Sequence, residues 1–210
     1  PPLKQVVSKS INAGFRGKLV GNAGWALAAY RTENYDDIQF IRTTGSSASG
    51  YFSNVGKTLR QGFDAYIYGA DTRLSWSAGL SVIQATYQDG FQAYTGNNLD
   101  TSRVAKGDNI PEIPKFQLKL RAAYKVTPEW RIGGNLVANS GVYLQGNENN
   151  GYYGSGTSYL GNGKSGGYGV VHLDTQYRPQ QGNWVFFAKI YNLFNNTYST
   201  GGLQGASMFS

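Results

Sequence analysis

The stretch EWRIGGNLVANSGVYL, residues 129–144, alternates between two kinds of side chain along its whole length. Even-numbered positions from Trp130 to Leu144 are mostly apolar, whereas odd-numbered positions from Arg131 to Tyr143 are mostly polar or glycine. Alternation with a period of two predicts a β-strand with one apolar face. At roughly 3.3 Å per residue the strand would reach about 50 Å, more than an ordinary globular core can cover.

The composition favours strands and turns over helices. Among 210 residues there are 29 glycines and 16 tyrosines, and only 15% of the residues are charged. No apolar run approaches the roughly 18 residues that a membrane-spanning helix needs, which excludes a helical membrane protein. The chain has no cysteine, so disulfides and thiolate metal sites are excluded as well.

Alternation elsewhere predicts eight strands joined by connections that are alternately short and long. The strands are expected at residues 5–17, 23–35, 51–68, 73–88, 114–126, 129–145, 168–178 and 183–195. Short turns are expected at Lys18–Asn22, Ala70–Thr72, Thr127–Pro128 and Pro179–Gly182, and long loops near 36–50, 89–113, 146–167 and 196–210. This alternation is typical of an outer-membrane barrel, whose periplasmic turns are tight and whose extracellular loops are long.

The tryptophans support this interpretation independently. Each lies within a few residues after one of the four short turns: Trp25, Trp76, Trp130 and Trp184. Indole rings favour the membrane–water boundary, so the four predict a girdle at the periplasmic interface. Alternatively, the four tryptophans could be ordinary core residues at the start of the second strand of each hairpin.

The opposite face of the strands is predicted to line a basic lumen. The net charge is +7, which suits either solubility or the attraction of anions. The basic residues expected to face the lumen are Arg60, Lys119, Arg121, Lys125, Arg131 and Arg178. The charges are scattered rather than clustered among aromatics, so we expect no nucleic-acid partner.

Three stretches carry a family resemblance. YFSNVGKTLRQGFDAYI (51–67) resembles an N-x-G…R-x-x-G-hydrophobic-acidic stretch in the barrels of TonB-dependent outer-membrane receptors. KGDNIPEIPKFQLKLRAAYKV (106–126) resembles their proline-containing loop that leads into a lysine-bearing strand. VFFAKIYNLFNNTYSTGG (185–202) is similar to their penultimate strand, with Asn-Leu-Phe followed by a nearby tyrosine.

The resemblance implies an all-β fold: an antiparallel transmembrane β-barrel section, about eight strands of a 22-stranded barrel. It also implies a multi-pass location in the outer membrane of a Gram-negative bacterium. The expected partners are outer-membrane lipid, an N-terminal plug domain, the remaining barrel strands, and the TonB complex acting through the plug. We expect the chain to be part of a longer protein, because no plug and no closing strand are found in it. The basic lumen residues are then expected to contact the plug more often than a ligand.

The function implied by the resemblance is import of a scarce nutrient, most often a ferric siderophore or similar iron chelate. The candidate ligand-binding residues are aromatic and polar groups at the lumen mouth and in the loop above it: Tyr143, Gln145, Tyr152, Tyr153 and Tyr159. Tyrosine can stack on flat ligands at low entropic cost, although these rings could equally pack the loop itself. A passive porin-like channel and a soluble β-rich binding domain remain open as alternatives.

Catalysis, cofactors and resident metals are not expected. With one histidine and no cysteine, neither a thiol nucleophile nor a multi-histidine metal cluster can be built. His172 and Asp174 share a strand face but are interpreted as polar wall residues. Glu148 and the pair Asp36–Asp37 are interpreted as loop carboxylates, and the glycines and lysine of residues 151–167 lack the spacing of a phosphate loop.

Overall fold

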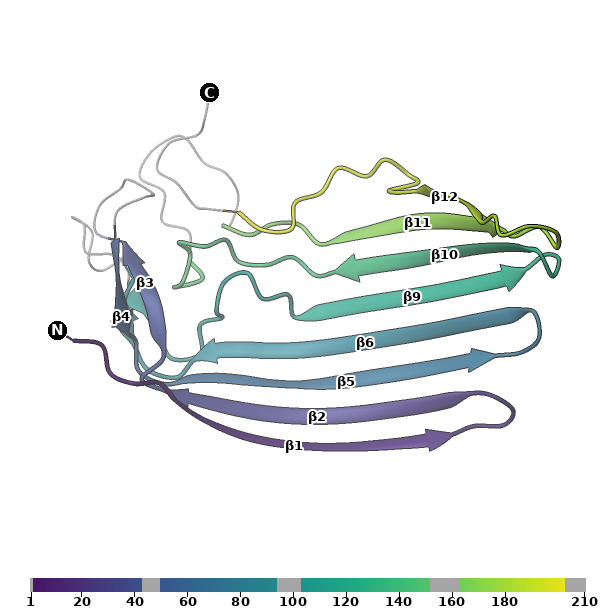
Figure 1. Ribbon diagram of the computed structural model, residues 1–210. Helices are drawn as coiled ribbons and strands as arrows, with labels where there is room; N and C mark the ends of the chain where they lie inside the picture. Colours follow the sequence, from purple (N-terminus) through teal and green to yellow (C-terminus); the bar gives the residue numbers. More distant parts are fainter. Residues whose placement is uncertain (1, 43–49, 94–102, 152–162, 203–210) are drawn as a thin grey trace, which may run out of the picture.

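The computed structural model describes residues 2–42, 50–93, 103–151 and 163–202. Within these ranges eight strands form one antiparallel sheet, in which the order across the sheet follows the order along the chain (Figure 1). The strands are β1 (Val7–Lys18), β2 (Gly24–Tyr35), β5 (Thr58–Ala70), β6 (Leu74–Tyr87), β9 (Phe116–Lys125), β10 (Trp130–Asn139), β11 (Tyr168–Tyr177) and β12 (Phe186–Ile190). We call this sheet the wall; β1 and β12 are its edges.

The wall has two unlike ends. All four tight turns lie together at one end, at the right in Figure 1, which we call the turn end. The long connections gather at the opposite, loop end, where β3 (Ile38–Arg42) pairs with β4 (Gly50–Asn54) (Figure 1). Another connection carries a short hairpin of β7 (Phe91–Gln92) and β8 (Arg103–Val104). Short and long connections therefore alternate as the sequence predicts.

The turn between β5 and β6 is held by one carboxylate. Oδ1 of Asp71 accepts the backbone N–H groups of Arg73 and Leu74, both at 2.7 Å. Aspartate suits such a position because its short side chain can reach backbone donors two or three residues ahead. The two hydrogen bonds lower the pKa of Asp71 below its ordinary value.

Strand register separates the side chains of the wall into an apolar face and a polar face. Ala29 of β2 lies opposite Phe63 of β5, which lies opposite Val82 of β6, which in turn lies opposite Phe116 of β9. Such rows repeat toward the turn end, so aliphatic and aromatic side chains cover one face continuously. The intervening residues form a face of lysine, arginine, serine, asparagine and tyrosine, because neighbouring residues in a strand point to opposite sides.

Glycines in the wall make room for aromatic rings on the neighbouring strand. A Cβ added at Gly69 would lie 2.8 Å from the ring of Trp76, and one at Gly17 would lie 2.7 Å from that of Trp25. Tyr68 covers Gly24 in the same way, since its hydroxyl oxygen lies 2.6 Å from where a Cβ of Gly24 would stand. At these three positions the ring occupies the volume that a side chain would take, so glycine on one strand is matched to an aromatic residue on the next.

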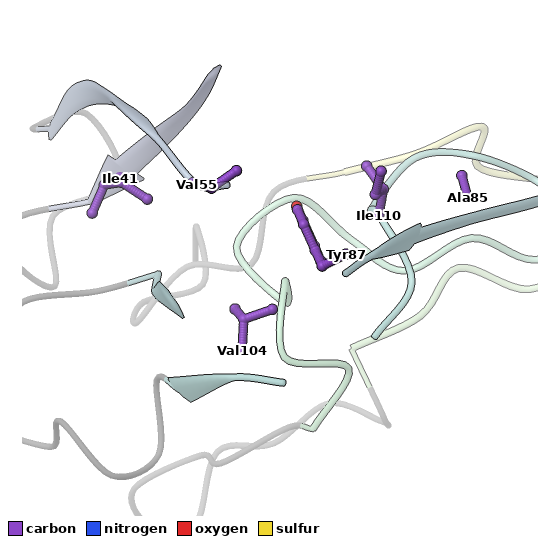
Figure 2. Packing of buried hydrophobic residues seen from close by; sticks show 6 residues of the cluster. All are labelled: Ile41, Val55, Ala85, Tyr87, Val104 and Ile110. Atoms are coloured by element: carbon purple, nitrogen blue, oxygen red, sulfur yellow. The ribbon is translucent and has the colours of Figure 1, made fainter. Parts of the chain in front are cut away.

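The buried hydrophobic core lies at the loop end. Figure 2 shows its six members, which come from β3, β6, β8 and the connections between strands. They are Ile41, Val55, Ala85, Tyr87, Val104 and Ile110, with Phe91, Ala93 and Ile113 packed against them. We call this cluster and the segments that carry it the cap.

The cap packs on the polar-face side of the wall. Ala85 and Tyr87 of β6 alternate with Gln84 and Thr86, which share the parity of the apolar row residue Val82. Buried polar groups fasten the cap to the wall: Oδ2 of Asp37 accepts the Thr58 hydroxyl at 2.5 Å and lies 3.2 Å from Nη1 of Arg60. The loops between β2 and β5 and between β6 and β9 therefore fold inward as one packed unit.

Three expected strand boundaries are wrong. The strand expected at 51–68 is two strands, because Gly56 adopts φ 83° and the chain turns between β4 and β5. The strand expected at 129–145 ends at Asn139, so the regular segment spans 10 residues, about 33 Å, rather than about 50 Å. The strand expected at 183–195 is confined to Phe186–Ile190, after which Asn192 takes a positive φ of 50°.

No helix in the described ranges is long and apolar enough to cross a membrane.

Candidate functional site

A pocket of about 490 Å³ lies at the loop end, where the connections after β10 and before β9 and β11 meet. Its lining includes two lysines, one tyrosine, two serines and an asparagine. These are Lys115, Lys164, Tyr143, Ser140, Ser165 and Asn109. Lys115 directly precedes β9 and has the parity of Lys119, so it continues the polar face of that strand. We call this hollow the mouth pocket.

Backbone pairing across the third long connection builds one side of the mouth pocket. The N–H of Leu144 donates to the carbonyl of Gly163, and the N–H of Ser165 donates to the carbonyl of Val142, both at 2.9 Å. Tyr143 and Lys164 are thereby bridged as antiparallel neighbours. Gly141 is required beside this pairing, since any Cβ there would collide with the carbonyl oxygen of Ser165.

The paired residues form an aromatic and cationic surface. Nζ of Lys164 lies 4.1 Å from the centroid of the Tyr143 ring, which is cation–π geometry. Lys115 adds a second ammonium group to the same pocket, and the hydroxyls of Ser140 and Ser165 add hydrogen-bonding groups. Such a combination can recognise a ligand that is both flat and anionic.

Below the mouth pocket, the polar face carries a line of cations. Lys119, Arg121 and Lys125 occupy three of the odd-numbered positions of β9, which lie on this face. Arg131 of β10 is paired with Asp174 of β11, with Nη2 and Oδ1 2.9 Å apart. Arg60 shares the polar-face parity on β5 but is engaged by Asp37 of the cap.

Tryptophans mark the turn end of the apolar face. Trp25, Trp76 and Trp130 all share the parity of that face. They lie close to the turn end of β2, β6 and β10, respectively. Nε1 of Trp130 donates to the Thr175 hydroxyl at 2.8 Å. Trp184 lies exposed in the connection just before β12. Three of the rings therefore lie at the turn-end edge of the apolar band, and a membrane-interface role for the four tryptophans stays a prediction.

Comparison with known proteins identifies the wall. The sequence model of the family described as TonB dependent receptor-like, beta-barrel matches residues 1–193. This chain belongs to that family. The family consists of receptors and transporters of the Gram-negative outer membrane rather than enzymes, and the eight strands are a section of its barrel. Membership decides against a porin-like channel and against a soluble β domain.

This chain spans only a small part of the length of the relatives that it matches. A probable TonB-dependent siderophore receptor of Acinetobacter baumannii, PiuA, is 29% identical over 119 residues, which are 55% of this chain and 15% of PiuA. The crystal structure of PiuA superposes with a TM-score of 0.67 at 18% identity, covering 93% of this chain and 25% of PiuA. The ferric-catecholate import receptor Fiu of E. coli superposes with a TM-score of 0.66 at 18% identity, covering 95% of this chain and 25% of Fiu. The copper transporter OprC superposes with a TM-score of 0.68 at 19% identity, covering 97% of this chain and 28% of OprC.

The candidate ligand residues of the receptor are only partly described. Tyr143 lies in the mouth pocket, and the backbone N–H of Gln145 next to it donates to the carbonyl of Gly202 at 3.0 Å. Tyr152, Tyr153 and Tyr159 lie outside the described residues. A ligand role for all five stays a prediction.

The remaining candidates have local partners. The pair His172 and Asp174 is not coupled: Nδ1 of His172 accepts the N–H of Asn192 at 3.0 Å, while Asp174 pairs with Arg131. Arg178 follows β11, and its N–H donates to the carbonyl of Glu129 at 2.8 Å. In the described ranges no group of three histidine, cysteine or acidic residues could hold a metal ion.

Sequence reasoning missed Lys115 and Lys164 as members of the mouth. Lys164 stands in a glycine-rich loop, and only the pairing across that loop brings it to Tyr143. Lys115 was visible as the first residue of an alternating strand, KFQLKL, on the same parity as Lys119. That parity places Lys115 on the polar face from the sequence alone, but nothing in the sequence indicates that it lies at the mouth.

Proposed function

We propose that the whole receptor imports an anionic iron chelate of the siderophore class, and that the mouth pocket belongs to its capture site. The observation that carries the proposal is the convergence of Lys115, Tyr143 and Lys164 on one hollow of about 490 Å³. Two ammonium groups favour an anion, and a tyrosine ring favours a flat, partly apolar one. A pocket that size suits a small organic ligand.

The relatives support this substrate class. PiuA is named a siderophore receptor, and Fiu a ferric-catecholate import receptor. A ferric catecholate is anionic and aromatic, which are the two properties that the mouth pocket would recognise. We infer that the polar face below, with Lys119 and Arg121, contacts either the chelate during passage or a plug domain that TonB moves.

The test is ligand binding by the full-length receptor, purified from outer membranes in detergent. Titration with a ferric catecholate chelate, followed by quenching of tryptophan fluorescence, should give a lower affinity for Lys164→Gln and for Lys115→Gln. Each loss should be about tenfold, the usual size of one charge-assisted contact. Tyr143→Leu should weaken the aromatic chelate more than a hydroxamate chelate of equal charge.

Lys106→Gln is the matched control, because Lys106 is an exposed lysine in a connection at the loop end and does not line the mouth pocket. It removes the same charge and should leave the affinity unchanged. If Lys106→Gln and Lys164→Gln lowered the affinity equally, the cause would be the change in overall charge and not a contact in the mouth pocket. Unchanged binding by the Lys115 and Lys164 variants together would overturn the assignment of the mouth pocket.

A further inference from the structure

The apolar face of the wall stops abruptly on its way to the loop end. On β2, β5 and β6 the row Ala29–Phe63–Val82 is apolar and the next row, Arg31–Gln61–Gln84, is polar, whereas Ile11 of β1 continues the apolar face beside Arg31. The polar row is joined by hydrogen bonds: Nη1 of Arg31 donates to Oε1 of Gln61 at 3.0 Å, and Nε2 of Gln61 donates to Oε1 of Gln84 at 2.8 Å. In a membrane, this row marks where the acyl chains end and the headgroups begin.

A cationic cluster lies at this boundary and points away from the polar face. Arg31 and Lys57 both pair with Glu33, each with a nitrogen 2.8 Å from a carboxylate oxygen. The Tyr35 hydroxyl also donates to Glu33, at 2.9 Å. Lys9 lies opposite Glu33 in the strand register, and the ammonium groups of Lys9 and Lys57 lie 5.1 and 5.0 Å from the Tyr35 ring centroid. We call these five residues the outward cluster.

The outward cluster keeps a net positive charge. Three cations surround one carboxylate, which leaves a net charge of +2. The Arg31 side chain is 51% exposed, so part of its five-donor guanidinium remains open to a further acceptor. The backbone of Lys57 is also fixed, because its N–H donates to Oδ2 of Asp89 at 2.7 Å. Glu33 and Tyr35 thus fix the cations side by side rather than neutralise them.

Among the described residues of β9, β10 and β11, the apolar face carries no comparable group of cations at its loop end. Along the apolar face of β9, β10 and β11, the residues nearest the loop end are Phe116, Ala138 and Gly169, none of which is charged. A uniform rim of cations would serve solubility or general attraction to a charged surface. A single cluster beside uncharged neighbours instead fits one bound group.

We propose that the outward cluster binds the phosphate of a lipid headgroup in the leaflet on the loop side of the outer membrane. Lipid phosphates lie immediately beyond the acyl chains, at the level of Arg31. Arginine and lysine bind phosphate oxygens through charge-assisted hydrogen bonds, and the guanidinium can do so through two nitrogens at once. The site lies on the face opposite to the mouth pocket, so the proposal does not depend on what the receptor imports.

The experiment measures lipid binding by the full-length receptor, delipidated in detergent. Native mass spectrometry would count bound molecules during titration with bis-phosphorylated lipid A, with dephosphorylated lipid A of the same acyl composition, and with inorganic phosphate. The test variant is Lys9→Gln/Arg31→Gln/Lys57→Gln. The control is Arg16→Gln/Lys18→Gln/Lys125→Gln, which removes the same charge from the polar-face parity of β1 and β9.

The wild type and the control should bind one phosphorylated lipid tightly, and the test variant should lose roughly 100-fold in affinity. That size follows from a factor of about five for each cation near a phosphate surface. The dephosphorylated lipid should bind all three proteins equally and weakly. Equal binding of phosphorylated lipid by test and control variants, or binding of inorganic phosphate as tight as that of lipid, would overturn the proposal. Heat-dependent electrophoretic mobility verifies that each variant has folded.

Discussion

The wall and the cap use apolar side chains in opposite ways. In the wall, large apolar side chains such as Phe15 of β1, Phe63 of β5 and Trp130 of β10 are 73%, 41% and 42% exposed. In the cap, Tyr87 and Val104 are 0% exposed. One chain therefore carries an apolar surface that its surroundings must cover, and an apolar core that it covers itself.

This contrast shows where each region obtains its stability. The wall is held by its hydrogen-bond ladder and by lipid against its apolar face, since an exposed apolar surface this large is unstable in water. The cap is held by packing among residues of distant connections, as in a soluble protein. The stability of the wall should therefore depend on the surrounding lipid, and the stability of the cap should fall when a cavity is made in its core.

Truncation in the core of the cap should have the largest effect. Tyr87→Ala leaves a cavity and should cost the cap about 4 kcal/mol, in the range found for large aromatic truncations. Hydrogen exchange of the full-length receptor should then show lost protection in the cap, while β9 and β10 remain protected.

Tyr87→Phe is the matched control for that truncation. Within the described part of the chain, the Tyr87 hydroxyl is buried without a hydrogen-bond partner, and burial raises the pKa of this phenol. Removing the hydroxyl should leave protection unchanged or increase it. If Tyr87→Phe lowered protection as much as Tyr87→Ala, the apolar core would not be what holds the cap.

A charge on the apolar face should have the next largest effect. Leu120 lies in the middle of the apolar positions of β9, so Leu120→Arg should lower the free energy of folding into lipid vesicles by about 3 kcal/mol. Gln117→Arg on the polar face of the same strand should change it by less than about 0.5 kcal/mol. Comparable losses in the two variants would contradict the assignment of faces.

Filling a glycine beneath a ring should have a smaller effect. Gly69→Ala places a Cβ within 2.8 Å of the Trp76 ring, and should cost about 1–2 kcal/mol and shift the fluorescence of that tryptophan. At Gly79 the nearest ring atom, of Tyr66, would be 3.4 Å away, which is ordinary contact. Gly79→Ala should therefore be tolerated, and a greater loss there would refute the role given to the rings.

The smallest effect is expected at the turn end, and it depends on pH. The pKa of Asp71 is lower in the folded chain than in the unfolded chain, because backbone N–H groups donate to the carboxylate. Its contribution to stability is present above the unfolded pKa and is lost as the pH falls through the folded one. Asp71→Ala should thus unfold more easily than wild type at pH 7, and the difference should shrink below about pH 4. A difference that did not vary with pH would exclude the carboxylate as its cause.

The wall could be predicted from the sequence and the cap could not. Alternation over residues such as 116–125 is a local property, so it predicts the strands and their two faces, whereas the tryptophan girdle stays a prediction. The break at Gly56 was invisible because it depends on Asp89, whose carboxylate lies 2.5 Å from where a Cβ of Gly56 would stand. Nothing in the sequence indicates that Val104 and Ile41 belong to the same buried core.

The mouth pocket falls between these cases. Extending the alternation of β10 to Tyr143 predicted that this residue lies at the mouth, and Tyr143 does line the mouth pocket. Lys164 was not, since its position follows from backbone pairing across the whole connection. The expected total of 22 strands, the plug and the roles of Tyr152, Tyr153 and Tyr159 stay predictions.

The division of the wall into a lipid face and a water face can be measured along β9 in the full-length receptor embedded in lipid nanodiscs. The 210 residues contain no cysteine, so single cysteines at positions 117–122 can each carry a spin label. Even positions should be accessible to oxygen, which concentrates in lipid, and odd positions to a water-soluble nickel chelate. Equal accessibility of neighbouring positions, or the reverse pattern, would contradict the claim that the apolar face meets lipid and the basic face meets water.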